Sequence, residues 1–203
     1  MNFNFSEDQL AVLDVVKEFT EKELAPYVDL MQDEDHLPEG FFQKAGETGI
    51  IGISMPEEYG GLGMDHQTLM AALVEIGKVA PGPVISITTT LAGLEIIRKN
   101  GSQEQKDKYL AAGIAGELVA GMAFTEAGTG SDPKQLTTTA TEDGDYVVLN
   151  GVKRFITNAA FPGPQVIYAK DADTGLCSAY IIDKFCEGYS LSTPWEKIGT
   201  KGS

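Results

Sequence analysis

Two short segments contain most of the residues that could do chemistry. The first reads Thr-Glu-Ala-Gly-Thr-Gly-Ser-Asp over residues 125–132. It combines hydroxyls and a carboxylate with Gly128 and Gly130, which let the backbone approach a bound group closely. Successive backbone N–H groups in such a loop can hold a phosphate. Considered alone, the Gly-rich stretch is equally well explained as a turn between two strands.

The second segment reads Lys-Arg-Phe-Ile-Thr-Asn over residues 153–158. Thr125 and Thr157 each end a strand-like run, so both could place a hydroxyl at the edge of a flat ring, and Phe155 could pack beside that ring. A flavin needs this combination: donors at the ring edge, an apolar surface beside it and backbone N–H groups for the pyrophosphate. The two segments together therefore favour a flavin as the ligand.

The other reactive side chains are weaker candidates. His36 and His66 have no His or Cys at ligand spacing, so no metal site is expected. Glu57 and Glu58 are neighbours in sequence, which rarely converge on one substrate, and a solvated loop is expected there. The two cysteines are too few for a disulfide framework, so we expect reduced thiols and a cytoplasmic protein.

Helical patterns fill residues 1–115, which we expect to form an all-helical domain. Ser6 with Gln9, and Ser102 with Gln105, form capping-box patterns that begin helices. The first helix is expected to end before Pro26, because a proline disfavours helical geometry in the residue that precedes it. Further helices are expected at residues 41–45, 65–78 and 91–99, and a turn-rich loop at residues 55–63.

From about residue 118 the pattern changes to short β-branched and aromatic runs. Asp143-Gly144 and Asn150-Gly151 are hairpin-type dipeptides between these runs. We therefore predict an α+β chain whose second domain, residues 116–203, is antiparallel and β-barrel-like. The last strands would leave an open sheet edge, which indicates a truncated domain. The expected strands are residues 137–141, 146–149, 152–157, 166–169, 179–182 and 189–193.

The composition excludes several classes of partner. The net charge of −15 would repel nucleic acid and anionic membranes, so neither is expected. No apolar run approaches the roughly 18 residues that cross a bilayer, and the N-terminus lacks a signal-peptide pattern. An acidic surface still permits a phosphate-bearing cofactor, because backbone N–H groups can hold one locally.

The motifs resemble those of the acyl-CoA dehydrogenase family in order, spacing and residue type. The loop at 125–132 and the segment at 153–158 are similar to the two flavin-facing segments of that family. Pro-Glu-Glu-Tyr-Gly-Gly-Leu-Gly at 56–63, Lys-Ile-Gly-Thr-Lys-Gly-Ser at 197–203 and the opening at 5–9 also match, so the resemblance covers the whole chain. One departure is Phe155, where the family more often has Trp; Phe keeps the stacking surface but lacks the indole N–H.

The resemblance implies FAD as the cofactor and assigns residues to it. Phe124 and Thr125 would lie at the flavin ring, Gly130 and Ser131 near the pyrophosphate, and Thr157 would donate towards N5. Ser131 would also contact the acyl-CoA substrate. The implied cofactor-binding residues are Met122, Phe124, Thr125, Gly130, Ser131, Phe155, Ile156 and Thr157.

The implied reaction is α,β-dehydrogenation of an acyl-CoA thioester, with hydride transfer to flavin N5 and proton removal by a carboxylate base. The family carries that base in a C-terminal four-helix domain, so we expect a chain truncated before that domain and assign it no catalytic residue. Glu126 is expected to be structural. The resemblance also implies electron-transferring flavoprotein as partner and a homo-oligomer, a tetramer where the C-terminal domain is present. Residues 71–77 and 85–94 are expected to form one wall of the acyl site.

Two classes of function remain open from the sequence. The chain is either the N-terminal and middle part of an enzyme, or a non-catalytic module that binds flavin or acyl-CoA or pairs with a related subunit. A closed sheet and a monomer would favour the module, whereas an exposed edge would favour the enzyme. Within the enzyme class, an acyl-CoA oxidase or a related flavin monooxygenase shares these motifs and differs mainly in oxygen access to the flavin.

Overall fold

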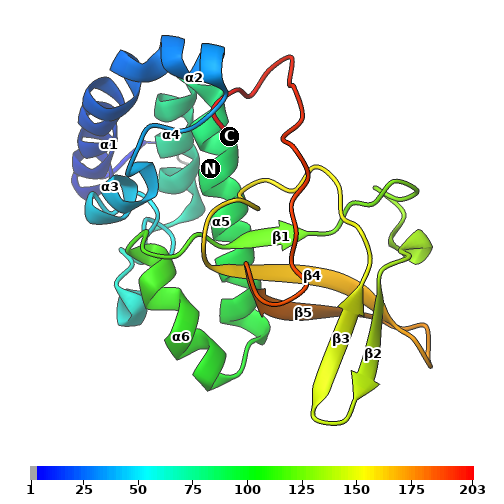
Figure 1. Cartoon of the computed structure of the whole chain (residues 1–203). Helices are drawn as coiled ribbons and strands as arrows, with labels where there is room; N and C mark the ends of the chain where they lie inside the picture. The colour runs from blue at the N-terminus through cyan, green and yellow to red at the C-terminus, as the bar shows by residue number, and fades with distance from the viewer. Residues whose placement is uncertain (1–3) are drawn as a thin grey trace.

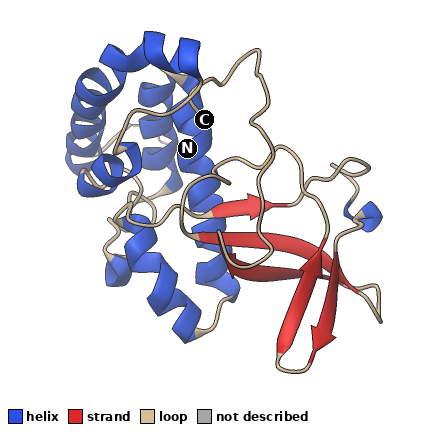
Figure 2. Ribbon diagram, in the orientation of Figure 1, coloured by secondary structure: helices blue, strands red, loops and turns tan. Residues whose placement is uncertain are grey.

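Helices occupy the first half of the chain and strands the second (Figures 1 and 2). The computed structural model describes residues 4–203. The helices are α1 (Glu7–Phe19), α2 (Val28–Glu34), α3 (Phe41–Glu47), α4 (His66–Gly77), α5 (Pro81–Asn100) and α6 (Gln103–Ile114). The strands are β1 (Gly121–Ala123), β2 (Thr139–Asp143), β3 (Tyr146–Asn150), β4 (Pro164–Asp171) and β5 (Cys177–Asp183). The predicted order of helices before strands is confirmed.

Side-chain caps begin two helices where the sequence predicts them. Ser6 Oγ accepts from Gln9 N at 3.2 Å and Gln9 Oε1 accepts from Ser6 N at 2.8 Å, and the same capping box begins α6. The α-helix α1 ends before Pro26, as predicted, but not for the predicted reason, because Ala25 directly before the proline keeps helical dihedrals, φ −55° and ψ −39°. The backbone nevertheless stays helical, because a π-helical turn at Thr20–Leu24 and a 3-10 turn at Ala25–Tyr27 connect α1 to α2.

Helix α5 is much longer than the predicted 91–99. Pro81 occupies the first helical position, where a missing N–H costs nothing. Thr88 Oγ1 donates to Val84 O at 2.9 Å and Thr90 Oγ1 donates to Ser86 O at 3.0 Å, so these hydroxyls are satisfied by the helix itself. The resulting helix of 20 residues packs against α4 and α6 on one side and against β1 and β4 on the other (Figure 1).

Aromatic rings connect the helical core to the sheet half. Phe19 and Phe41 have ring centroids 6.1 Å apart, Phe41 and Phe42 5.2 Å, and Phe42 and Phe161 5.0 Å. Tilted and edge-on pairs at these separations each contribute about 0.5–1.5 kcal/mol beyond the burial of their area. Phe161 belongs to the loop between β3 and β4, so this loop is anchored on the helices.

The sheet is mixed, which corrects the purely antiparallel pairing expected from the sequence. Its order is β1-β4-β2-β3, and β5 pairs with β4 as well. The β2–β3 and β4–β5 pairs are antiparallel, whereas β1 and β2 both pair with β4 in parallel. Hairpin dipeptides predict only antiparallel neighbours, and parallel pairs join segments far apart in the chain, which local patterns do not indicate.

Two predicted strands do not form. Residues 152–157 and 189–193 are irregular, and Phe155 has a positive φ of 58°, which strand pairing does not allow. Asp143-Gly144 does lie at the turn between β2 and β3. Asn150-Gly151, in contrast, ends β3 and leads into the loop of residues 151–163 and not into a hairpin.

Strand β3 lies at an end of the sheet order and has an exposed surface. Tyr146, Val147 and Val148 are 78%, 48% and 50% exposed. This edge is not the one expected at the last strands of the chain, and that expectation stays a prediction. Across residues 4–203, no helix combines the length and the apolar character needed to cross a membrane.

After β5 the chain returns to the helices, and its last residues lie beside them (Figure 1). Gly202 N donates to Asp35 Oδ1 at 2.8 Å, and Lys197 Nζ forms an ion pair with Asp35 at 3.1 Å. A side chain at Gly82 in α5 would overlap the carbonyl oxygen of Lys201, so only glycine allows this approach. The C-terminal segment thus ties the sheet half back to α2 and α5.

Candidate functional site

The loop after β1 folds back on itself. Glu126 N donates to Thr129 O at 3.0 Å, Thr129 N donates to Glu126 O at 3.3 Å, and Thr129 Oγ1 donates to the Asp132 carbonyl oxygen. Gly128 and Gly130 are exposed, and a Cβ built on either would meet no atom within 4 Å. The loop is therefore held by its own hydrogen bonds while its glycine face is open.

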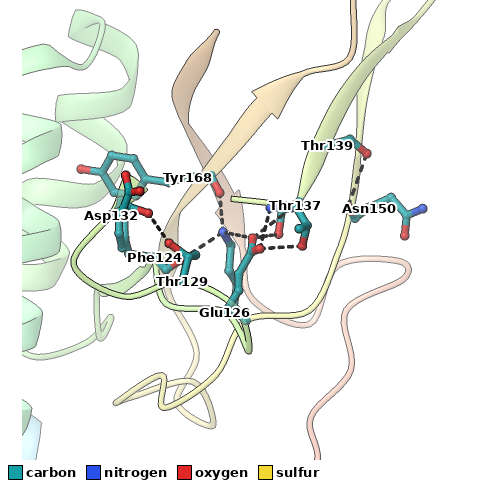
Figure 3. A network of polar contacts seen from close by, with 10 residues as sticks. Phe124, Glu126, Thr129, Asp132, Thr137, Thr139, Asn150 and Tyr168 are labelled. Carbon is teal, nitrogen blue, oxygen red and sulfur yellow. Dashed lines mark hydrogen bonds and ion pairs between the residues drawn. The ribbon is translucent and has the colours of Figure 1, made fainter. Parts of the chain in front are cut away.

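Glu126 lies at the centre of a buried polar network (Figure 3). Its carboxylate accepts from Thr137 N and Oγ1 at 2.6 Å each, from Thr138 N at 3.0 Å and from Thr138 Oγ1. Lys153 Nζ forms an ion pair with it at 2.8 Å, and the two charged side chains are only 3% and 9% exposed. This network joins the loop after β1 to the chain entering β2 and to the segment after β3.

The surroundings of Glu126 fit a structural anion. Burial alone would raise the pKa of its carboxyl, but hydrogen bonds from Lys153, Thr137 and Thr138 together hold that pKa well below its ordinary value. A carboxylate with so low a pKa and so many donors is a poor acceptor for the proton of a carbon acid. The geometry thus supports the structural role expected for Glu126.

Lys153 and its neighbour join the two sequence segments. Lys153 Nζ also donates to Phe124 O at 3.2 Å and to Tyr168 O at 2.5 Å. Arg154 N donates to Thr125 O at 2.7 Å, so the backbones of the two segments are in direct contact. Sequence reasoning gave Lys153 no role. A signal was available, since Lys153 is a cation beside the apolar residues of a predicted strand. A lysine buried there needs a carboxylate partner, which predicts an ion pair.

The predicted residues of the first segment lie in β1 or in the loop that follows it. Met122 is in β1 with its side chain 37% exposed. Phe124 packs edge-on against the ring of Tyr168, with centroids 5.2 Å apart. Thr125 is half-buried, and Ser131 is exposed. The first segment therefore combines a packed base with an exposed tip.

The predicted residues of the second segment lie in the loop of residues 151–163. Phe155 is 68% exposed, and its ring centroid is 5.6 Å from that of Trp195. Ile156 and Thr157 are half-buried. Phe155 thus presents its ring mainly to solvent.

These residues fit a flavin. Within the described chain, the hydroxyls of Thr125, Ser131 and Thr157 hydrogen-bond to no other residue, so all three are available as donors. Phe155 offers an exposed ring, and the open face at Gly130 allows backbone N–H groups to approach a pyrophosphate. No group of His, Cys, Asp and Glu side chains among residues 4–203 could hold a metal ion.

A second buried cluster lies where the loop of residues 151–163 meets the helices. Lys184 is 6% exposed, and its Nζ donates to Val119 O and Asn158 O, both at 2.8 Å. Asn158 Nδ2 donates to Ser86 O at 2.9 Å and to Thr90 Oγ1 at 3.0 Å. Sequence reasoning gave neither Lys184 nor Asn158 a role, because both depend on contacts between distant segments.

Lys184 predicts a specific pH dependence of stability. Burial lowers the pKa of its amine from 10.5 to about 8, and the neutral amine still has the N–H donors that its two carbonyl partners need. Between these pKa values the unfolded chain keeps a proton that the folded protein releases, so folding is favoured as the pH rises. We expect the free energy of unfolding of the wild type, relative to Lys184→Met, to increase from pH 8 to about pH 10 in urea titrations. A constant or falling difference would contradict the lowered pKa.

Family models match both halves of the chain. The model of the acyl-CoA dehydrogenase N-terminal domain matches residues 6–117, and the model of the middle domain of the same family matches residues 121–203. These matches include the helices, the loop after β1 and the segment that follows β3.

Individual relatives agree with the family models. A short-chain-specific acyl-CoA dehydrogenase of Clostridium acetobutylicum is 34% identical over 208 residues, which cover 100% of this chain and 55% of the relative. A 3-(aryl)acrylate reductase of Clostridium sporogenes is 35% identical over 203 residues, covering 98% and 54%. The solved structure of an acyl-CoA dehydrogenase complexed with FAD from Bacillus anthracis is 32% identical with a TM-score of 0.88, covering 98% of this chain and 34% of that chain. The chain thus spans about half the length of the curated relatives it matches.

Proposed function

Because the chain belongs to the acyl-CoA dehydrogenase family, we propose that it supplies part of an FAD site that serves the α,β-dehydrogenation of an acyl-CoA thioester. One observation carries this proposal: Lys153 and Arg154 join residues 125–132 and 153–158 into a single structure. Each segment alone is a common loop. Joined, they place free hydroxyls, an open glycine face and an exposed aromatic ring on connected backbone.

Each residue has a distinct role in the proposed site. Thr125 and Thr157 would donate to the edge of the flavin ring, and Phe155 would pack beside it. Gly130 and Ser131 would receive the pyrophosphate on the open face of the loop. Met122, Phe124 and Ile156 complete the lining. FAD supplies the hydride acceptor for this chemistry.

The Glu126–Lys153 network would keep both segments rigid. Donors that are already fixed need no reorganisation when a ligand binds or reacts, which is why preorganised sites are effective. The base that removes the α-proton is not assigned to any residue of this chain. Glu126 is not proposed for that role, because it is buried and its pKa is held low.

The substrate and partners of the whole protein are also proposals. Ser131 would contact the acyl-CoA, and α4 with the first part of α5 would form one wall of the acyl site. An electron-transferring flavoprotein would accept the electrons, and a cytoplasmic homo-oligomer is the expected form. Since the relatives carry the names of both a dehydrogenase and a reductase, hydrogen transfer in either direction fits the proposal.

A non-catalytic flavin-binding module is the second candidate. It follows from one observation: Glu126, the carboxylate of the loop after β1, is fully engaged in structural hydrogen bonds, so this chain offers no base at the proposed site. Both candidates require FAD binding, so acyl-CoA turnover by the whole protein separates them. Turnover supports the enzyme, whereas tight FAD binding without turnover supports the module.

Gly130→Ala tests the proposed pyrophosphate contact. Because a Cβ there meets no atom within 4 Å, the free energy of unfolding should change by less than about 0.5 kcal/mol. The methyl group would stand on the face proposed for the pyrophosphate, so the affinity for FAD should fall about tenfold, which corresponds to the loss of about one good contact. Flavin fluorescence titration measures the Kd.

Gly199→Ala is the matched control. Gly199 also has no atom within 4 Å of a built Cβ, but it lies outside both segments. Its substitution should leave the Kd for FAD at the wild-type value. Equal Kd values for the wild type and both variants would remove Gly130 from the site.

A further inference from the structure

The turn that contains Phe155 and Asn158 is strained. Both residues have positive φ, 58° and 65° respectively. Asn tolerates this conformation, but a bulky aromatic residue adopts it rarely. Such strain costs about 1–3 kcal/mol and persists only where the surroundings enforce it, which happens most often at functional sites. The contacts that enforce the turn are therefore of functional interest.

The side chain of Asn158 holds the turn on α5. Asn158 is 4% exposed, and its Nδ2 donates to Ser86 O at 2.9 Å and to Thr90 Oγ1 at 3.0 Å. Thr90 Oγ1 in turn donates to Ser86 O at 3.0 Å, so the three groups form a closed network on one stretch of the helix. Because the amide nitrogen only donates, these two acceptors fix the orientation of the Asn158 amide.

The backbone of the same turn is held from the opposite direction. Lys184 Nζ donates to Asn158 O at 2.8 Å, and Tyr189 Oη donates to Ala159 O at 2.9 Å. Both donors come from the chain at or after the end of β5. Asn158 is thus held on two sides. Its side chain donates to helix α5, and its carbonyl oxygen accepts from Lys184, directly after β5.

The hydrogen bonds of this cluster are incomplete within the described chain. Asn158 Oδ1 and Ser86 Oγ are buried and have no hydrogen-bond partner in the described chain. An unpaired buried polar group costs about 1–3 kcal/mol. The hydrogen bonds from Asn158 to α5 must offset this cost for the turn to keep its conformation.

We propose that Asn158 is a positioning residue that sets the conformation of residues 155–157 from helix α5. It would thereby couple α5, the proposed wall of the acyl site, to the turn proposed to face the flavin. The functional meaning of this coupling rests on the proposed function. The conformational effect itself can be measured without any cofactor.

Trp195 provides the measurement. It is the only tryptophan of the chain, and its ring lies 5.6 Å from that of Phe155. Quenching of its fluorescence by acrylamide therefore reports how well the turn is held in the folded protein. Asn158→Gly removes the amide but keeps a residue that adopts positive φ freely, so the backbone conformation itself remains allowed.

A matched pair on α5 makes the test independent of the Asn158 variant. Thr90→Val removes an acceptor of the Asn158 amide. Thr88→Val removes a hydroxyl that bonds only to the carbonyls of Val84 and Ile85 on the same helix. Because Trp195 is already 55% exposed, full exposure can raise acrylamide quenching by at most about twofold. We expect quenching to increase towards this limit for Asn158→Gly, to a smaller extent for Thr90→Val, and not at all for Thr88→Val.

Wild-type quenching in a folded Asn158→Gly protein would overturn the proposal. If that variant does not fold, equal quenching in Thr90→Val and Thr88→Val would overturn it instead. The Kd for FAD then tests the functional half, with about tenfold weaker binding expected for Asn158→Gly. Failure of the wild type to bind FAD would refute the proposed function, whereas wild-type FAD affinity in Asn158→Gly would refute only the role of Asn158.

Discussion

Replacement of Glu126 by alanine is expected to destabilise the protein by about 3–5 kcal/mol, because the substitution leaves the buried Lys153 ammonium without its partner. It also removes the acceptors of the Thr137 and Thr138 backbone N–H groups. Urea unfolding at pH 7, followed by circular dichroism, measures the change in the free energy of unfolding. We expect the same variant to lose FAD binding, since both segments depend on this network.

Two controls distinguish the effect of breaking the buried Glu126–Lys153 ion pair from the effect of removing any charged side chain. Asp14→Asn removes an ion pair with Lys17 whose side chains are 76% and 51% exposed, so its effect should stay below about 1 kcal/mol. The double variant Glu126→Met with Lys153→Met should be less destabilised than either single variant, because no buried charge is left unpaired. If the free energy of unfolding of the Glu126→Ala protein lies within about 1 kcal/mol of the wild-type value, the network does not hold the site together.

Gly151→Ala is expected to destabilise the protein by about 3 kcal/mol, the upper end for an overpacked position. A Cβ at Gly151 would lie 2.7 Å from Thr138 Cα, and main-chain atoms cannot rotate away as a side chain can. Thr138 is also fixed from two sides, since it donates to Glu126 and its carbonyl accepts from Lys170 N at 2.8 Å. The added methyl must therefore displace the segment before β2 that completes the Glu126 network.

The comparison for Gly151→Ala is Gly130→Ala, which adds the same methyl group to the same region without a steric conflict. The free energies of unfolding of the two variants, measured by thermal and urea unfolding, should differ by about 3 kcal/mol at 25 °C. Similar stabilities would mean that Thr138 can move without loss, and the rigidity claimed for the site would then be wrong.

Local signals in the sequence predict the helical half well. The capping boxes at Ser6 and Ser102 begin helices in the structure, because a cap depends only on residues three apart. The beginning of α5 was missed because Pro81, Gly82 and Pro83 are typical of turns. There the helix is stabilised by packing against both halves of the molecule, which outweighs weak local propensity.

The same limits explain what was missed at the site. The residue types of both segments indicate a flavin, but residues 152–157 have the composition of a strand and the structure of a loop. Their conformation is fixed by two contacts: Lys153 bonds to Glu126, and Asn158 bonds to Ser86 on α5. These contacts join residues 27 and 72 positions apart, so no short window of the sequence contains them.

On the proposed function, residues 125–132 and 153–158 form one flavin site. The most direct measurement is to mix the purified chain with FAD, separate the mixture by size exclusion and record the visible spectrum of the protein peak. We predict that flavin co-elutes with the protein and that its absorption band is shifted and better resolved than that of free FAD, as expected for a ring held against Phe155 and fixed donors. A folded protein that elutes without flavin, at every FAD concentration tested, would contradict the account.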